Sequence, residues 1–443
     1  MPVIATSSAN VYAEQEIVRR GIVSLVFVVF LLLIFEGALR KWALPEVQRP
    51  LYFARDPFVL MIYGYALVYG MISRSTVMYT IILFAVPVSM LHLLLALLGT
   101  GHPVAWALGV RHYFFYIPLA FIMGHCLRFD DVARLVRFNL FLAVPIGLLV
   151  YVQHRSPPTA FINRALADGS DAVTWVANDV LRPYGTFTHA SGHVLYVAAS
   201  VAMLALAWLL RREMRLSLWL LLPSSVATLV MALTTGSRAI WFFLASTALC
   251  LAVVAMSTMS ISQRSRSLGF VTIALLGVIV LYASMLTPAY EAMLARQEVA
   301  ARSEGSIFLR VFGSVTHAFE ILDEAPVAGS GLGAGILGAV AVTTGERFFA
   351  LAETEWDRIV LELGPVLGLG FIGLRIVVVA WLFRVSMVAN RVFANPAGLL
   401  LFSFAGLHVF NGQITMSGQG SVFAWFFVGL TLAATNSVGN RIR

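Results

Sequence analysis

The sequence predicts an all-α integral membrane protein with about twelve transmembrane helices and one long extracytoplasmic loop that contains an amphipathic helix. Two observations support this fold class. Hydrophobic residues make up 60% of the chain and charged residues 12%, and the mean hydropathy is +0.87, whereas about a quarter of the residues in a soluble domain are charged. The apolar residues also occur in runs of about twenty, the length of an α-helix that crosses a bilayer. We therefore expect residues 1–443 to form a single polytopic domain.

The apolar windows give the expected spans in chain order. They lie at about residues 18–35, 57–72, 77–98, 104–126, 134–152, 192–210, 216–235, 239–257, 269–286, 359–383, 397–411 and 420–436. Two of the connections are long, at 153–191 and 287–358. Cys126 and Cys250, the only cysteines, both lie within apolar windows, so we expect neither a disulfide framework nor a cysteine-based metal site.

Arginine residues predict the orientation of the chain. They cluster in alternate connections, and cytoplasmic connections carry an excess of positive charge. Both termini are therefore expected to be cytoplasmic, whereas the connections 153–191 and 287–358 are expected to face outward. The arginines that follow the rule are Arg19, Arg20, Arg74, Arg128, Arg134, Arg137, Arg211, Arg212, Arg215, Arg264, Arg266, Arg384, Arg391, Arg441 and Arg443.

Other basic residues lie on the predicted outer side, where this rule does not account for them. Lys41 is the only lysine; the others are arginines, whose planar guanidinium groups bind phosphate with two hydrogen bonds. We expect about half of these cations to be neutralised by nearby acids and the rest to form an outward-facing basin for a phosphorylated or pyrophosphorylated ligand. The outer basic residues are Arg40, Lys41, Arg49, Arg55, Arg111, Arg155, Arg164, Arg182, Arg238, Arg296, Arg302, Arg310, Arg347 and Arg358.

The first outer connection allows two interpretations. Its arginines either clamp headgroup phosphates or form local ion pairs, with Arg40 on Glu36 and Arg55 on Asp56. Arg111 lies farther along, a turn or two inside the fourth span. An unpaired buried arginine costs about 2.5 kcal/mol or more, so Arg111 needs a partner or an aqueous cavity, and we expect it to line a cavity.

The second long connection ends with Arg182, His189 and His193 near the start of the sixth span. Ser191 is expected to cap this helix, whose amino end favours an anion. Two histidines four residues apart also resemble a metal pair, but no acidic residue completes an H-E-x-x-H motif. Arg182 and His189 are therefore candidate ligands of an anion rather than of a metal.

Arg238 lies in the tight connection between the seventh and eighth spans, beside Gly236. A lone arginine in such a turn is usually an interfacial anchor. Because Arg238 is the only charged residue of its connection, we favour a functional role.

The connection 287–358 carries the predicted amphipathic helix. Arg310 begins a run that places Phe312, Val315, Phe319 and Leu322 on one face, and Pro326 follows its end. A glycine cluster comes next, and its backbone N–H groups are expected to be accessible to a phosphate. The cluster is Gly329, Gly331, Gly333 and Gly335.

Acidic residues close this connection. Glu353, Glu355 and Asp357 lie within five positions, and Glu362 follows within the tenth predicted span. Such carboxylates either balance the charge of the arginines or supply a general base. Arg375, inside the tenth span, is expected to extend toward the cytoplasmic headgroups.

Four motifs occur in order along the chain. They are R-x-x-G-T-F at 182–187, S-R at 237–238, an arginine opening an amphipathic helix that runs to P-x-x-G-x-G (Arg310 and 326–331), and E-L-G at 362–364. Together they resemble the bacterial O-antigen ligase and O-antigen polymerase family of membrane glycan transferases, over about residues 182–370. The resemblance implies a GT-C-like arrangement of about twelve helices. It also implies a site at the outer face of the bacterial cytoplasmic (inner) membrane.

The resemblance further implies the substrate. Members of this family transfer a glycan from polyprenyl diphosphate without a metal, and the matching positions imply that Arg238 and Arg310 bind the donor diphosphate. Ligase-type members carry histidine followed by asparagine about nine residues before E-L-G, where this chain has Glu353 and Thr354. This departure favours a polymerase of exopolysaccharide or O-antigen repeat units.

We therefore predict a metal-independent inverting glycosyltransferase. A hydroxyl group of the acceptor glycan attacks the anomeric carbon of the lipid-linked donor, and Glu353 or Glu355 acts as the general base. The residues expected to hold the diphosphate are Arg111, Arg182, His189, Arg238 and Arg310.

The expected partners are a polyprenyl-diphosphate-linked glycan donor, a glycan or lipid A core acceptor, and membrane lipids. We expect no cofactor, metal or nucleic acid. A ligase that transfers the glycan to lipid A core is the nearest alternative. A lipid-linked sugar transporter or flippase would instead require ionisable residues near the bilayer midplane and two related halves, and a non-catalytic scaffold would require the outer arginines to be neutralised.

Overall fold

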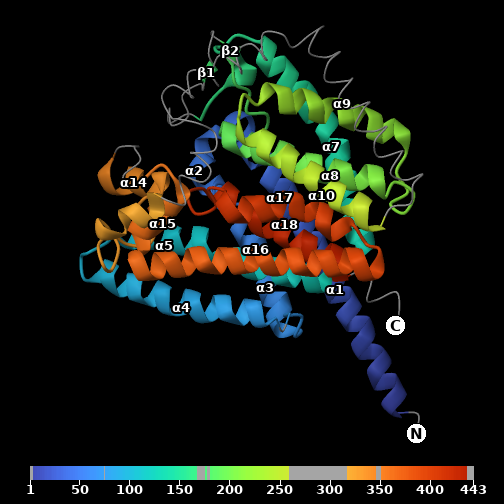
Figure 1. The fold of residues 1–443 in the computed structure, drawn as a ribbon, viewed down its shortest axis with the longest axis horizontal. Helices are drawn as coiled ribbons and strands as arrows, with labels where there is room; N and C mark the ends of the chain where they lie inside the picture. The colour runs from blue at the N-terminus through green and yellow to red at the C-terminus, as the bar shows by residue number, and fades with distance from the viewer. Residues whose placement is uncertain are drawn as a thin grey trace.

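The computed structural model describes residues 3–73, 75–166, 175–176, 180–258, 317–345 and 351–436, and every structural statement below concerns these residues. They form a bundle of helices with one short antiparallel pair of strands (Figure 1). Eight of the helices are long and apolar enough to cross a membrane. The predicted class, an all-α membrane protein, is confirmed; the count of twelve spans stays a prediction.

The elements follow one another along the chain with short connections. The α-helices are α1 (Val3–Ala38), α2 (Gln48–Leu51), α3 (Asp56–Val68), α4 (Thr76–Leu97), α5 (Pro103–Val110), α6 (Ile117–Cys126), α7 (Phe129–Arg155), α8 (Ala190–Leu209), α9 (Leu218–Thr234), α10 (Ala239–Thr258), α14 (Leu337–Thr344), α15 (Glu355–Leu363), α16 (Pro365–Phe393), α17 (Ala397–Asn411) and α18 (Gly418–Asn436). The strands are β1 (Trp175–Val176) and β2 (Val180–Leu181). The 3-10 turns are η2 (Pro45–Val47), η4 (Phe161–Asn163) and η6 (Ile321–Asp323).

The apolar windows coincide with helices wherever the chain is described. Only the window 269–286 lies outside the described residues. The tenth window begins too early, because residues 359–363 belong to the separate helix α15. Gly364, at φ +82°, and Pro365, the first residue of α16, break the helix there, since proline lacks the backbone N–H that a continuous helix needs.

Two helices continue into π-helical turns that carry basic residues. α1 ends in η1 (Leu39–Ala43), and α5 is followed by η3 (Arg111–Phe115). A π-turn inserts one extra residue into the helix, so it changes the direction of the side chains around it. Arg40, Lys41 and Arg111 all lie on these turns.

The core of the bundle surrounds α18. This helix is buried over nearly its full length and packs against α6, α17 and α8. A Cβ atom on Gly429 would lie 2.9 Å from the Cα of Ala120 on α6, so glycine permits the close approach that is common between membrane helices. At the edge of the bundle α4 exposes leucines such as Leu83 and Leu94, consistent with contact to lipid.

Different elements gather at the two ends of the bundle. α5, α14 and α15 lie together at one end, at the left of Figure 1, which we call the α15 end. At the opposite end Arg19 of α1 donates to the carbonyl of Cys126, and Asn436 of α18 donates to that of Gly124. We call this the Arg19 end. The candidate residues at 353–362 belong to the α15 end.

Candidate functional site

Glu355 lies at the centre of a buried ionic network. Arg375 donates to its carboxylate at 3.0 Å, Arg358 forms a second ion pair with it, and the backbone N–H groups of Ile414 and Thr415 donate at 3.0 and 2.9 Å. Two arginines and two amides therefore occupy the carboxylate, which is buried. A general base needs access to the proton that it removes. The contacts argue against Glu355 as a base and assign it a structural role.

Arg375 does not extend toward the cytoplasmic headgroups as expected. Besides Glu355, its guanidinium donates to the carbonyls of Val409 at 2.8 Å and Gly412 at 2.9 Å. These partners lie at the end of α17 and hold the short connection to α18. The earlier expectation was wrong because Glu355, 20 residues away in sequence, comes within reach only in the folded chain.

The glycine cluster binds a protein carboxylate. The N–H groups of Gly333 and Gly335 donate to Glu362 at 3.0 and 2.9 Å, and the hydroxyl group of Tyr113 donates at 2.7 Å. Burial raises the pKa of the Glu362 carboxyl group, and Arg358 and these donors act against that shift. Because these amides are already used, the expectation that they hold a phosphate is wrong for this part of the cluster.

The same loop joins two of the sequence motifs. The N–H of Ser330 donates to the carbonyl of Leu361 at 2.8 Å, and that of Gly331 donates to the carbonyl of Glu362 at 3.1 Å. Gly329 and Gly331 have φ of +72° and +109°, a region that glycine adopts without strain. P-x-x-G-x-G and E-L-G are therefore in direct contact.

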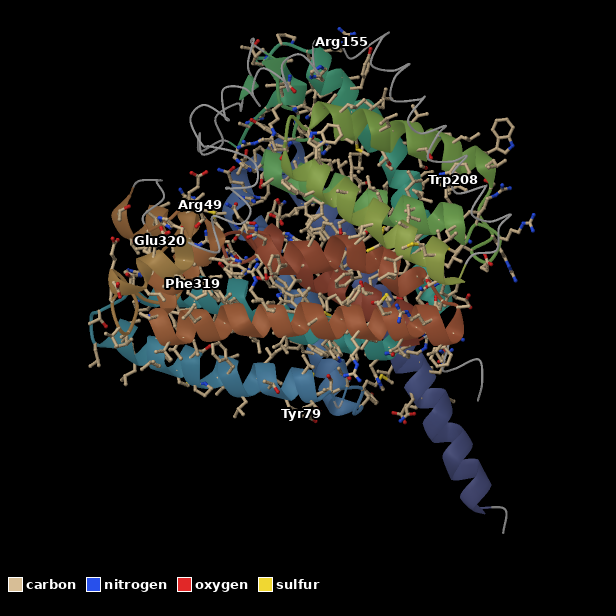
Figure 2. The ribbon with its side chains drawn as sticks, in the orientation of Figure 1. Arg49, Tyr79, Arg155, Trp208, Phe319 and Glu320 are labelled. Atoms are coloured by element: carbon tan, nitrogen blue, oxygen red, sulfur yellow. The ribbon has the colours of Figure 1, made fainter. Side chains whose placement is uncertain are left out.

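An exposed histidine pairs with a buried aspartate beside this loop. The Nδ1 atom of His317 lies 2.9 Å from the Oδ2 atom of Asp357, and the hydroxyl group of Thr354 also bonds that oxygen. The His317 side chain is 57% exposed, whereas that of Asp357 is 4% exposed. Figure 2 shows the neighbouring Phe319 and Glu320 at the α15 end of the bundle. The sequence analysis missed His317 because 40 residues separate it from Asp357.

Glu353 keeps its place among the candidates. It is exposed, two residues before the buried Glu355. Its backbone carbonyl accepts a hydrogen bond from the side-chain amide of Gln413 at 3.2 Å. Glu353 therefore lies near the surface of the α15 end, next to the connection between α17 and α18.

Arg111 is paired and does not line a cavity. Its guanidinium donates to both oxygens of Asp56, at 2.6 and 3.2 Å, and to the carbonyl of Tyr52 at 3.1 Å. The rings of Tyr52 and Phe53 cover it at 4.5 and 5.0 Å. A buried pair with these contacts satisfies the arginine, so Arg111 is a poor ligand for a diphosphate.

Local ion pairs also account for the first outer connection, with one exchange of partner. Arg40 pairs with Glu36 at 3.0 Å, as the second interpretation predicted. Arg55 pairs with Glu36 at 2.9 Å and not with Asp56, because Asp56 is engaged by Arg111. Arg40, Arg55 and Arg111 therefore do not form a common basin.

Arg182 brings two other motifs together. Its Nε atom donates to the carbonyl of Thr235 at 2.6 Å, three residues before Arg238 in the turn that precedes α10. Gly236, at φ +56°, allows the chain to turn there. R-x-x-G-T-F and S-R are thus neighbours, and Arg182 and Arg238 belong to one group of elements.

His189, not Ser191, caps α8. Its Nδ1 atom accepts from the N–H of Ser191 at 3.2 Å, and the helix begins at Ala190. Burial, and secondarily Arg182, lowers the pKa of His189, which keeps the ring neutral at pH 7. With Nδ1 as the acceptor, its Nε2 atom carries the proton and can donate to an anion.

The connection between α17 and α18 touches both groups of candidates. On one side its residues bond Glu353 and Glu355, through Gln413 and Thr415. On the other side a Cβ atom added to Gly192, in the first turn of α8, would collide with the side chain of Gln419. The α8 amino end and the α15 end are therefore linked by this short segment.

Several predicted features lie outside the described residues. These are Arg310, the start of its amphipathic helix, and Arg296, Arg302 and Arg347. The end of that helix is described: residues 317–320 are helical, and η6 follows and ends before Pro326.

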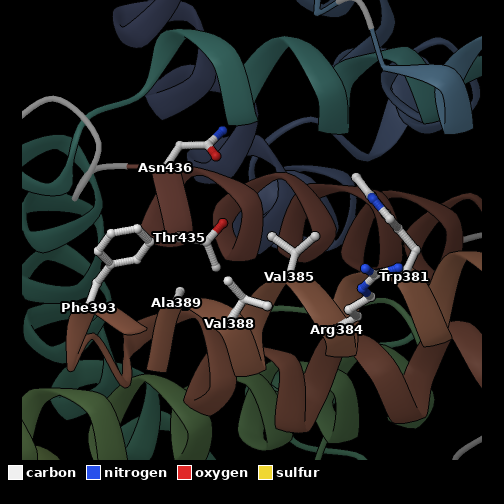
Figure 3. A pocket seen from close by; sticks show the side chains of 8 residues that line it. All are labelled: Trp381, Arg384, Val385, Val388, Ala389, Phe393, Thr435 and Asn436. Carbon is white, nitrogen blue, oxygen red and sulfur yellow. The ribbon is translucent and has the colours of Figure 1, made fainter. Parts of the chain in front are cut away.

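A pocket of about 350 Å³ lies elsewhere, between α16 and α18 near the Arg19 end (Figure 3). Trp381, Arg384, Val388 and Phe393 contribute to its lining, and none of the candidate residues does. Among the described residues, no group of three or more His, Cys, Asp or Glu side chains could hold a metal ion. The metal-independent mechanism stays a prediction.

Comparison with known proteins adds no assignment. No protein-family profile matches the chain, and no curated protein matches it significantly. The resemblance to O-antigen ligases and polymerases stays a prediction that rests on the motifs.

Proposed function

We propose that the chain is a metal-independent inverting glycosyltransferase that joins polyprenyl-diphosphate-linked oligosaccharide repeat units at the outer face of the bacterial cytoplasmic membrane. One observation carries this proposal. The connection between α17 and α18 contacts both the acidic α15 end, through Gln413 and Glu353, and the amino end of α8, through Gln419 and Gly192. A base and the cations for a leaving diphosphate can thus meet at one short segment.

The reaction is a single displacement. An acceptor hydroxyl group loses its proton to a base at the α15 end while its oxygen attacks the anomeric carbon of the donor. The bond between that carbon and the diphosphate oxygen breaks, and the diphosphate leaves with the electron pair. Attack opposite to the leaving group inverts the anomeric configuration.

The cations act on the leaving group. Arg182 and Arg238, with Arg310 from the same outer region of the sequence, stabilise the negative charge that develops on the diphosphate. Guanidinium groups that are already in position need little reorganisation during the reaction. The neutral His189 adds a hydrogen-bond donor. Arg111 and Glu355 are excluded from these roles by their own ion pairs.

Alanine at Arg182 or Arg238 tests the proposal. Each variant should form short glycans only, visible on a gel of extracted polysaccharide, because the leaving group is less stabilised. Arg212→Ala is the matched control, since Arg212 is exposed in the connection between α8 and α9. Normal chain length in both Arg182→Ala and Arg238→Ala, at wild-type protein levels, would refute the proposal.

A deletion strain separates polymerase from ligase. Loss of a polymerase leaves single repeat units, whereas loss of a ligase to lipid A core leaves lipid-linked polymer that is not transferred. We expect single repeat units. Accumulated polymer would move the assignment to the ligase.

A further inference from the structure

The α15 end contains a histidine that the sequence motifs do not include. His317 projects from the helical segment 317–320, and Asp357 is on the first turn of α15. Their contact, 2.9 Å between Nδ1 and Oδ2, joins two separate segments of the chain. Thr354, the residue before α15, bonds the same carboxylate oxygen, so this oxygen has two partners.

The contact sets the protonation pattern of the ring. A carboxylate only accepts hydrogen bonds, so Nδ1 of His317 carries the proton that is shared with Asp357. In the neutral ring Nε2 is then the acceptor. A carboxylate in this position holds an imidazole in the correct tautomer and stabilises the imidazolium that forms when the ring takes up a proton.

The exposure of the two side chains differs in the way that this role requires. Asp357 is 4% exposed and its position is fixed by the packing of α15, whereas His317 is 57% exposed and accessible to a substrate. A histidine held only for stability would usually be covered along with its partner. The pair therefore combines a rigid, buried orienting group with an accessible acceptor.

The alternatives at this end are weaker. Glu355 is surrounded by Arg358 and Arg375, and Glu362 is buried among the glycine amides and Tyr113. Glu353 is exposed, but the contact that fixes this residue is made by its backbone carbonyl, with Gln413. The described structure shows no carboxylate or amide that orients a proton acceptor on Glu353 as Asp357 orients His317.

We propose that His317, oriented by Asp357, is the general base that takes the proton of the acceptor hydroxyl group. This inference rests on the proposed glycan transfer and replaces Glu353 as the base. The proton moves from the hydroxyl oxygen to Nε2 as that oxygen bonds the anomeric carbon, and the imidazolium returns it to water after the product leaves. His317 is then a catalytic residue, and Asp357 a positioning residue.

Kinetics of purified variants test the assignment. His317→Ala should lower kcat by about 10²–10⁴-fold, with the KM for the lipid-linked donor nearly unchanged, because the donor diphosphate is bound elsewhere. His125→Ala is the matched control: His125 is another exposed histidine, at the opposite end of the bundle. Asp357→Asn should also lower kcat selectively, since an amide that donates to Nδ1 would move the ring proton to Nε2.

Chemical rescue distinguishes a base from a structural histidine. In His317→Gly, added imidazole should restore part of the lost kcat, because the exposed position leaves room for the small molecule. Donor binding, measured without acceptor, should equal that of the wild type. No rescue together with reduced thermal stability would overturn the inference in favour of a structural role.

The two proposals fail in different ways. An inactive Glu353→Gln together with a fully active His317→Ala would make Glu353 the base and leave the glycan transferase intact. Fully active Arg182→Ala and Arg238→Ala variants would instead remove the proposed transfer itself. Loss of kcat in His317→Ala, retained kcat in Glu353→Gln and rescue by imidazole together would support the inference.

Discussion

Glu353 and Glu355 are two residues apart, yet their surroundings are opposite. Glu353 is exposed, while Glu355 is buried between Arg358 and Arg375. The sequence could identify an acidic cluster but could not separate its members, because the arginine that fixes Glu355 comes from α16 and the amides come from the connection before α18. Long-range pairing decides which carboxylate is available for chemistry.

Replacing Glu355 should therefore affect stability first. In Glu355→Gln the two buried guanidinium groups lose their counter-charge, which costs about 3–5 kcal/mol when one partner of a buried pair is removed. Thermal unfolding of the detergent-solubilised protein should show a marked decrease in midpoint. The control Glu353→Gln, at an exposed position, should unfold like the wild type. Equal stability of both variants would contradict the role assigned to Glu355.

The outer arginines followed the prediction only in part. The sequence analysis expected about half of them to be neutralised, and Arg40, Arg55, Arg111, Arg358 and Arg375 all have carboxylate partners. Composition could not show which ones, since Arg55 pairs with Glu36 and not with the adjacent Asp56. Arg182 and Arg238 are the described arginines that carry the functional proposal.

At the scale of elements, apolar windows predicted the helices well because a span needs a long apolar run. They failed at Gly364 and Pro365, where a break in the backbone separates α15 from α16 without a break in hydropathy. They also gave no information on the glycine loop. Its glycines indicated flexibility or a phosphate, whereas the loop folds around Glu362.

Gly333 tests this view of the loop. It has φ +84°, and an added Cβ atom would collide with the carbonyl of Ala105 on α5. Gly333→Ala should destabilise the protein by about 1–3 kcal/mol, as overpacked sites do. Gly338→Ala, at an exposed helical position with no atom within 4 Å of the added group, should be neutral or slightly stabilising. Thermal unfolding of the two variants measures the difference, and equal effects would contradict the packing described here.

At the scale of the whole molecule, the bundle separates two chemically different ends. The α15 end carries Glu353 and His317, and the connection between α8 and α9 carries exposed arginines such as Arg212. The positive-inside rule predicts that the second of these faces the cytoplasm. Hydropathy and charge could predict this layout because insertion itself depends on them, whereas the meeting of the four motifs depends on tertiary contacts.

Cysteine labelling measures this orientation. Both native cysteines are buried, so they should react little with a membrane-impermeant thiol reagent. A single reporter in Glu353→Cys should be labelled from outside the cytoplasmic membrane, and one in Arg212→Cys only after the membrane is opened. The reverse pattern would place the α15 end in the cytoplasm and exclude an extracytoplasmic reaction.

Reconstitution tests the central claim, glycan transfer by this chain, most directly. Purified protein in liposomes would be supplied with a polyprenyl-diphosphate-linked repeat unit, and both glycan length and released polyprenyl diphosphate would be measured. We predict longer glycans and one diphosphate released for each unit added, with both signals lost in Arg238→Ala. Movement of the donor across the bilayer without any extension would contradict the account and identify a transporter.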